Sequence, residues 1–299
     1  MENGQDNADQ SVRPKLLVFL LLDGWGIAPP SEANALAKAK TPFFSRLVKE
    51  YPSASIRADL PSLNSRYLAL GTGVRQGESE SFSGPTLTGL VSQAGRKQLK
   101  LASAERLAAL TCFFSGRLEE RLPGEDWLSI SSLDRKRQPD PSLAQLRLTR
   151  ELIRNIESGQ YDFIIAASAA MDLAASRGDE ALVAETAARA DRNLSRIAAA
   201  VFEQKGVLVI SSSHGNAEKL KDLALEAPDR ERTNNPVPLI VCGEEYKGLS
   251  LGGSDAIGGD LSLAEPSGRL EDMAATLADI LGLPGRENLP GRSLVSLLA

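Results

Sequence analysis

Two polar clusters in the sequence have residue types that bind metals or move protons. Asp23-Gly24-Trp25-Gly26 follows the apolar run Lys15–Leu22, and His214-Gly215-Asn216-Ala217-Glu218 follows Val207–Ser212. Runs that are apolar on both faces predict strands buried in a parallel sheet, and ligand sites lie beyond the carboxyl ends of such strands. An Asp after a strand is also a common turn or cap residue, and a strand-end His is often a hydrogen-bonded core residue. Each cluster alone is therefore compatible with a purely structural role.

His214 is the only histidine among the 299 residues. A metal site with two histidines from this chain is excluded, and so is a mechanism with separate histidine acid and base. The two cysteines, Cys112 and Cys242, are too few for a disulfide framework.

Strands and helices alternate along the rest of the chain. Helices are expected from Pro42 onward and over Ser142–Ser158, Glu180–Gln204 and Arg269–Leu281. Strands are expected at Lys15–Leu22, Gln98–Ala102, Thr111–Phe114, Tyr161–Ala167, Val207–Ser212 and Val237–Cys242. This alternation predicts an α/β fold: a mostly parallel central sheet with helices on both faces, forming a three-layer sandwich.

Charge and hydropathy exclude several classes of function. The formal net charge is −5, with no basic surplus for nucleic acid. The apolar run Leu16–Leu22 has seven residues, too few to cross a bilayer, and no basic block predicts membrane binding. Residues 1–14 are polar, and we predict that they are a disordered segment before a single domain at 15–299. Residues 76–85 are predicted to be a linker. A cytoplasmic protein is expected.

The order of several motifs is more specific than any of them alone. The motifs are DGWG (23–26), Asn34-Ala35, Lys40-Thr41-Pro42, Asn64-Ser65, HGNAE (214–218) and Asn235-Pro236-Val237-Pro238. With Gly95–Gly116 and Arg269–Leu283, they give a sequence that from about residue 15 resembles the cofactor-independent phosphoglycerate mutase family of the alkaline phosphatase superfamily.

The resemblance implies an alkaline-phosphatase-like domain with a two-manganese site and a serine nucleophile. In the family, a large inserted domain holds the phosphoglycerate. Here Gly71–Arg75 leads through 76–85 directly into the segment that follows the insertion. We therefore expect the insertion to be missing.

For the first metal, the resemblance implies four ligands. Asp23, Ser65 and His214 match three of them, and Ser65 also matches the nucleophile. Ser213 stands where the family has an aspartate. A neutral hydroxyl is a poor replacement for a carboxylate at a divalent ion.

For the second metal, only Asp172 of three implied ligands remains. Ser176 and Arg232 stand where the family has histidines. Arg106 matches a lysine that contacts phosphate in the family, and it is expected to contact an anion. Arg66 replaces the glutamate that follows the nucleophile.

These substitutions replace metal ligands by hydroxyl groups and a cation. Without metal, Asp23 and Asp172 need another counter-charge. We expect Arg232 to pair with Asp172, assisted by Arg66 or Arg177.

Two functions remain open on these grounds. The first is a pseudoenzyme, with no cofactor expected, that binds a small anion or a protein partner. The alternative is a phosphate or sulfate ester hydrolase with one Mn or other divalent ion, Ser65 as nucleophile and Arg106 as anion clamp. Phosphoglycerate mutase activity is disfavoured, because without the insertion nothing closes over the substrate to exclude water.

Overall fold

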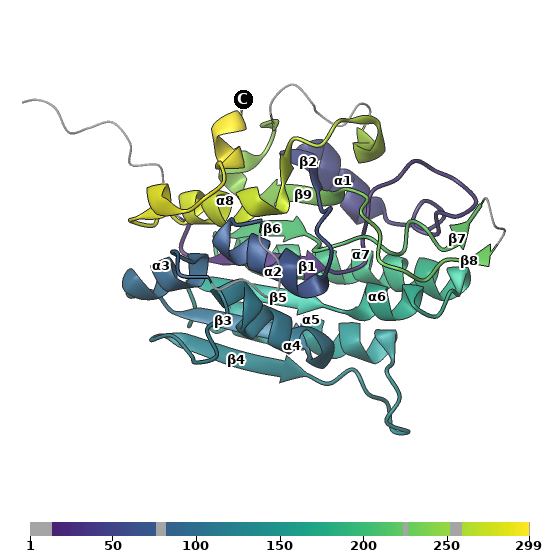
Figure 1. The fold of residues 1–299 in the computed structure, drawn as a ribbon, viewed down its shortest axis with the longest axis horizontal. Helices are drawn as coiled ribbons and strands as arrows, with labels where there is room; N and C mark the ends of the chain where they lie inside the picture. Colours follow the sequence, from purple (N-terminus) through teal and green to yellow (C-terminus); the bar gives the residue numbers. More distant parts are fainter. Residues whose placement is uncertain (1–13, 76–81, 224–226, 252–258, 299) are drawn as a thin grey trace, which may run out of the picture.

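The computed structural model describes residues 14–75, 82–223, 227–251 and 259–298 (Figure 1). Within them, the main sheet has the strand order β10-β2-β9-β6-β1-β5-β3-β4. Its strands are β1 (Leu17–Leu22), β2 (Ser53–Arg57), β3 (Gln98–Ser103), β4 (Glu125–Ile130), β5 (Phe163–Ser168), β6 (Val207–Ser211), β9 (Val237–Cys242) and β10 (Gly268–Arg269). All neighbours pair in parallel except β9, which is antiparallel to both β2 and β6. The short β7 (Lys221–Asp222) and β8 (Ala227–Pro228) form a separate ribbon.

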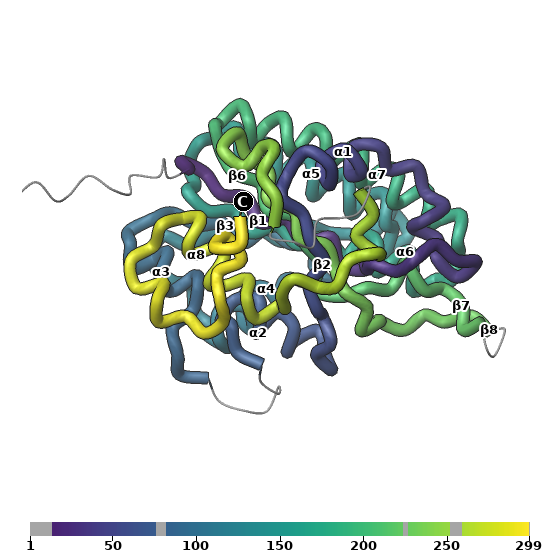
Figure 2. The backbone as a smooth tube through the Cα atoms, turned by 90° about the horizontal axis from the view of Figure 1, so that it is seen from above, coloured from purple at the N-terminus to yellow at the C-terminus, as the bar shows by residue number. Residues whose placement is uncertain are grey.

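Helices cover both faces of the sheet, and Figure 2 shows the two groups on opposite sides. One group is α2 (Leu63–Thr72), α3 (Leu87–Gln93), α4 (Ala104–Thr111) and α8 (Met273–Ile280). The other is α1 (Pro42–Glu50), α5 (Pro141–Glu157), α6 (Ala170–Ala175) and α7 (Glu180–Glu203). Side chains along β1 alternate between the two cores: Phe19 packs with the first group and Val18 with the second. This confirms the predicted three-layer α/β sandwich.

One predicted strand is wrong. Residues Thr111–Phe114 are not a strand, because α4 continues to Thr111 and a 3₁₀ turn follows at Phe113–Ser115. The segment is apolar because Phe114 is fully buried beneath the sheet, with its ring centroid 6.5 Å from that of Phe19. Apolarity alone did not separate a buried turn from a strand.

Because the central strands are parallel, their carboxyl ends lie at the same edge of the sheet. β1 lies between β5 and β6, in register with both. The residues that follow these three strands therefore meet at the carboxyl edge, where β2 and β10 also end. No helix among the described residues is both long and apolar enough to cross a membrane.

The domain boundaries stay predictions. Residues 1–13 of the predicted lead-in and 76–81 of the predicted linker lie outside the described residues. Fourteen residues separate the end of α2 at Thr72 from the start of α3 at Leu87.

Candidate functional site

Asp23 follows β1 at the carboxyl edge and is fully buried. The next residue, Gly24, has a φ of +96°, and a Cβ there would lie 2.7 Å from the backbone nitrogen of Asp172. A glycine is therefore required for this close approach. The Asp172 N–H donates to the Asp23 carbonyl oxygen at 3.1 Å, which places α6 directly beside the end of β1.

Both carboxylate oxygens of Asp23 are occupied by donors from the chain. Oδ1 accepts from the Ser213 backbone N–H at 3.1 Å and from the Ser213 hydroxyl at 2.7 Å. Oδ2 accepts from the Tyr67 hydroxyl at 2.8 Å and from Arg106 Nε at 2.5 Å. Each oxygen thus has two partners.

Asp172 lies in the first turn of α6 and is also largely buried. Its Oδ1 accepts from the Asn216 amide at 2.9 Å. Its Oδ2 accepts from Arg106 Nη2 at 2.5 Å and from Arg232 Nη2 at 3.1 Å. The expected pairing of Arg232 with Asp172 is confirmed.

Arg106 bridges the two carboxylates with a single guanidinium group. It lies in α4, just after β3, and its side chain is 4% exposed. Nε faces Asp23 and Nη2 faces Asp172. The sequence predicted that Arg106 contacts an anion, and in the structure it contacts two carboxylates of the chain itself.

The electrostatics keep both carboxyl groups ionised. Burial by itself would raise the pKa of Asp23, but Arg106, His214 and the hydrogen bonds from Ser213 and Tyr67 hold it below its usual value. Burial also opposes ionisation of Asp172, yet His214, Arg106 and Arg232 hold its pKa well below the usual range. Burial and the neighbouring Asp23 raise the pKa of Tyr67 far above 10, so that its phenol stays a donor.

His214 is fully buried between the two aspartates. The single hydroxyl hydrogen of Ser213 goes to Asp23, so His214 Nδ1, 2.8 Å from Ser213 Oγ, is the donor to that oxygen. Its Nε2 lies 3.2 Å from Asp172 Oδ1, an ion-pair distance when the ring is protonated, although without hydrogen-bond alignment.

Ser65 has a local structural contact. It is the third residue of α2, and its hydroxyl donates to the Ser62 carbonyl oxygen at 2.9 Å. Its backbone N–H is capped by the Ser62 hydroxyl at 3.1 Å. Among the described residues, no hydrogen bond joins Ser65 to Asp23, Asp172 or His214.

Among the described residues, neither Arg66 nor Arg177 makes a hydrogen bond or ion pair with Asp23 or Asp172, although both aspartates attract Arg66 at longer range and oppose the lowering of its pKa by burial. Arg66 donates to the carbonyl oxygens of Leu60 and Thr233 and to Asn234 Oδ1, at 2.8 to 3.2 Å. Arg177 donates to the carbonyl oxygen of Pro139. Ser176 is exposed and donates to the Leu173 carbonyl oxygen. Arg106, rather than Arg66 or Arg177, supplies the second positive charge, because only its side chain lies between the carboxylates.

The residues at this site do not fit a pair of divalent cations. A metal ligand needs a free lone pair, and both oxygens of Asp23 and Oδ2 of Asp172 each accept from two donors. The Arg106 guanidinium also stands between the carboxylates, where a cation would be repelled. In the described part of the chain, no group of three or more His, Cys, Asp or Glu side chains is arranged to hold a metal.

Two contributors to the site were missed from the sequence. Tyr67 donates to Asp23 from α2, and Asn216 donates to Asp172 from the loop after β6. Asn216 belongs to the polar HGNAE cluster, so the sequence already placed it near the predicted site. No sequence feature indicated Tyr67, because its contact with Asp23 depends on how α2 packs against the sheet.

We expect the free energy of unfolding to decrease as pH falls below about 4, the pKa of an aspartate in the unfolded chain. Asp23 and Asp172 have lowered pKa values in the folded state, so the unfolded state takes up protons first. Their contribution is present above that pKa and is lost on acidification. Urea unfolding from pH 6 to pH 3 measures the decrease, and Asp172→Asn should flatten it. An equal slope for both proteins would contradict the assignment.

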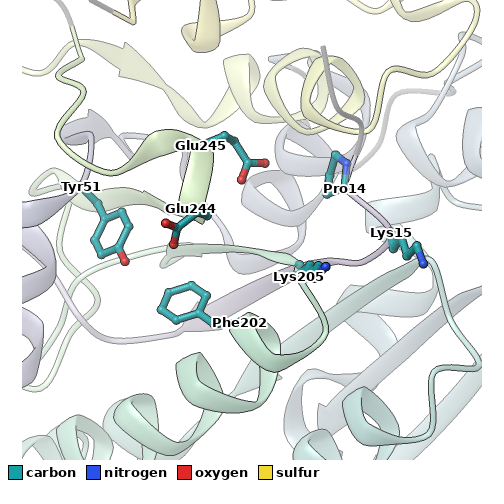
Figure 3. Close-up of a pocket in the computed structure, with 8 residues that line it drawn as sticks. Pro14, Lys15, Tyr51, Phe202, Lys205, Glu244 and Glu245 are labelled. Carbon is teal, nitrogen blue, oxygen red and sulfur yellow. The ribbon is translucent and has the colours of Figure 1, made fainter. Parts of the chain in front are cut away.

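A separate cavity of about 670 Å³ lies at the amino edge of the sheet (Figure 3). Tyr51 and Phe202 lie next to each other in its lining, with their rings tilted and the ring centroids 6.1 Å apart. Glu244 and Glu245 line one part and Lys205 another. None of the predicted site residues lines this cavity, so it is distinct from the Asp23–Asp172 site.

Comparisons with known proteins identify the family and the fold of the chain. A family model described as the metalloenzyme superfamily matches residues 15–285. A 2,3-bisphosphoglycerate-independent phosphoglycerate mutase of Desulforudis audaxviator is 36% identical over 216 residues, which cover 71% of this chain and 38% of the relative. One from Syntrophotalea carbinolica is 33% identical over 214 residues, covering 71% and 39%. The chain thus spans about two-fifths of the length of these relatives.

Solved structures share the fold at low sequence identity. Leishmania mexicana phosphoglycerate mutase has a TM-score of 0.75 at 12% identity, covering 97% of this chain and 99% of the other. A TAB5 alkaline phosphatase variant has a TM-score of 0.63 at 11% identity, with 91% and 99% covered. The phosphonate monoester hydrolase of Agrobacterium radiobacter also has 0.63, at 13% identity, with 95% and 77% covered.

Proposed function

Because the chain belongs to the metalloenzyme superfamily, with homology to cofactor-independent phosphoglycerate mutases, we propose that it is a member in which arginine side chains replace the catalytic cations. Such a protein binds ligands or partners and does not transfer phosphoryl groups. It is a pseudoenzyme built on an alkaline-phosphatase-like domain.

The observation that carries the proposal is the bridge made by Arg106. One guanidinium group lies 2.5 Å from Asp23 and 2.5 Å from Asp172. With Arg232 at 3.1 Å from Asp172, two positive charges balance the two carboxylates. A divalent ion added here would leave an uncompensated charge in a buried site, which is strongly unfavourable.

The one-metal hydrolase is less well supported. It requires Asp23, Ser65 and His214 to share an ion, with the Ser65 oxygen free to attack. The Ser65 hydroxyl instead donates to Ser62, and both Asp23 oxygens are occupied. His214 Nδ1 is engaged by Ser213, and its Nε2 faces Asp172.

The short connection between α2 and α3 also supports a binding role. Fourteen residues join the two helices, too few for a folded domain at that point. The mutase activity named for the relatives belongs to longer proteins, and the part that matches this chain spans only about two-fifths of their length. We propose that the carboxyl edge of the sheet is left accessible to another ligand or protein.

Metal analysis and a phosphatase assay test this function. Purified protein should contain substoichiometric Mn, Zn and Mg by elemental analysis. It should not hydrolyse p-nitrophenyl phosphate, with or without added Mn²⁺. Ser65→Ala is the matched control, and it should leave the background rate unchanged. Stoichiometric metal together with turnover that is lost in Ser65→Ala would overturn the proposal and establish the hydrolase.

A further inference from the structure

A second charged cavity lies at the edge of the sheet formed by β10 and β2. Its volume is about 400 Å³. It is lined by Arg57, Pro266, Ser267, Gly268, Arg269, Asp272 and Arg292. Arg57 ends β2 and Arg269 ends β10, so the cavity opens at the same carboxyl edge as the Asp23–Asp172 site. It is a separate place, because β9 and β6 separate β2 from β1, a distance of about 14 Å at ordinary strand spacing.

Two of the arginines are direct cross-strand neighbours. Arg269 pairs with Arg57 in the parallel register of β10 and β2. Paired residues project to the same side of a sheet, and like charges in this position are destabilising. Within the described residues, the Arg57 side chain makes no hydrogen bond or ion pair. Arg57 therefore has no ion pair that would offset this repulsion.

The one carboxylate that lines the cavity is already used by the backbone. Asp272 Oδ2 accepts from the Arg269 backbone N–H at 2.9 Å, and Oδ1 accepts from the Arg292 backbone N–H at 3.0 Å. These bonds fix the two chain segments that carry the arginines. They leave the carboxylate without a bond to any of the three guanidinium groups.

The acidic side chains near this cavity form ion pairs with another arginine, Arg75. Arg75 pairs with Asp59 at 2.9 Å and with Glu271 at 3.2 Å. The hydrogen bond from Arg75, with a smaller contribution from Arg269, lowers the pKa of Asp59. Arg292 Nη2 donates to the Ser267 carbonyl oxygen at 2.5 Å, which holds this side chain over the cavity. Three guanidinium groups thus face one engaged carboxylate.

We propose that this cavity binds a small oxyanion with two or more negative charges, such as a phosphate ester, a pyrophosphate or a polycarboxylate. Guanidinium groups match the oxygens of phosphate and carboxylate in bidentate geometry. Three of them around 400 Å³ complement several oxygens at once. The protein as a whole is negatively charged, so this concentration of positive charge is local. The site is independent of whether Asp23 and Asp172 hold metal.

Calorimetric titration of the whole chain tests the site. The probes are inorganic pyrophosphate and citrate, each at ionic strength matched with sodium chloride, because surface charge attraction is screened by salt. We expect one saturable site for at least one probe. In Arg57→Gln and Arg269→Gln, affinity should fall by about tenfold or more, the usual effect of losing a hydrogen bond between charged groups. Arg154→Gln is the matched control, since its side chain is 78% exposed on α5, and it should bind like the wild type.

Thermal unfolding separates ligand binding from folding. Without ligand, Arg57→Gln should unfold at the same temperature as the wild type or higher, because it removes a like-charge repulsion. With pyrophosphate or citrate at the same concentration, Arg57→Gln should be stabilised less than the wild type. Equal stabilisation of both proteins, or no saturable binding of either probe, would overturn the proposal. So would an affinity loss in Arg154→Gln as large as in Arg57→Gln.

Discussion

Arg106→Met will destabilise the protein by about 3–5 kcal/mol, the cost of removing one partner from a buried ion pair. The substitution keeps an unbranched aliphatic stem and removes the guanidinium group. Asp23 then loses its only hydrogen-bonded cation, and Asp172 keeps Arg232 and the neighbouring His214. Urea unfolding at pH 7 measures the loss. Arg154→Met, at an exposed position on α5, should change stability by no more than about 0.5 kcal/mol.

A triple variant separates charge from packing. Arg106→Met combined with Asp23→Asn and Asp172→Asn removes both carboxylate charges together with the cation. Neutral replacements of a buried ion network are often tolerated, so much of the lost stability should return. If the triple variant is as unstable as Arg106→Met, the effect of Arg106 lies in its shape and the charge bridge is contradicted.

Restoring the ligands that the family resemblance implies should restore metal binding. The variant combines Ser213→Asp, Ser176→His, Arg232→His and Arg106→Lys. Ser176 lies one helical turn after Asp172, so a histidine there projects to the same side. Wild-type protein should show no shift in unfolding temperature with Mn²⁺. The variant should bind Mn²⁺ in stoichiometric amounts and gain about 2.7 kcal/mol at a hundredfold excess over Kd.

Asp172→Ala in the restored variant is the matched control, and it should abolish the Mn²⁺-dependent stabilisation. Elemental analysis after gel filtration provides a second readout that is independent of activity. A wild-type protein stabilised by Mn²⁺ to the same extent would contradict the claim that its own side chains replace the cations. A restored variant that folds yet binds no metal would show that these four positions do not account for the difference.

The central strands could be predicted from the sequence because strands buried on both faces consist almost entirely of apolar residues. β1, β5, β6 and β9 are covered on both faces, so their residues form continuous apolar runs. β2 was missed because Ser53–Arg57 is half polar, and α2 was missed because it is buried nearly all round. Tyr67, Leu68 and Leu70 are all inaccessible, so α2 shows no apolar stripe.

At the site, the sequence predicted which residues lie together better than it predicted their contacts. One edge of the sheet brings together Asp23, His214, Asp172 and Arg232. This follows because the carboxyl ends of neighbouring parallel strands lie at the same edge. The bridge by Arg106 was not predictable from spacing, since it depends on the reach of a long side chain across two strands. The expected help from Arg177 was wrong for the same reason, and Arg66 acts on the two aspartates only at longer range.

The guanidinium bridge makes the charge balance of this site independent of the metal ions in solution. An ion held by side chains is exchanged with solvent, competes with other ions and is withdrawn by chelators. The positive group between Asp23 and Asp172 is attached to the polypeptide by covalent bonds and stays protonated at every physiological pH. The architecture around it is therefore complete as soon as the chain has folded, whatever the local supply of trace elements.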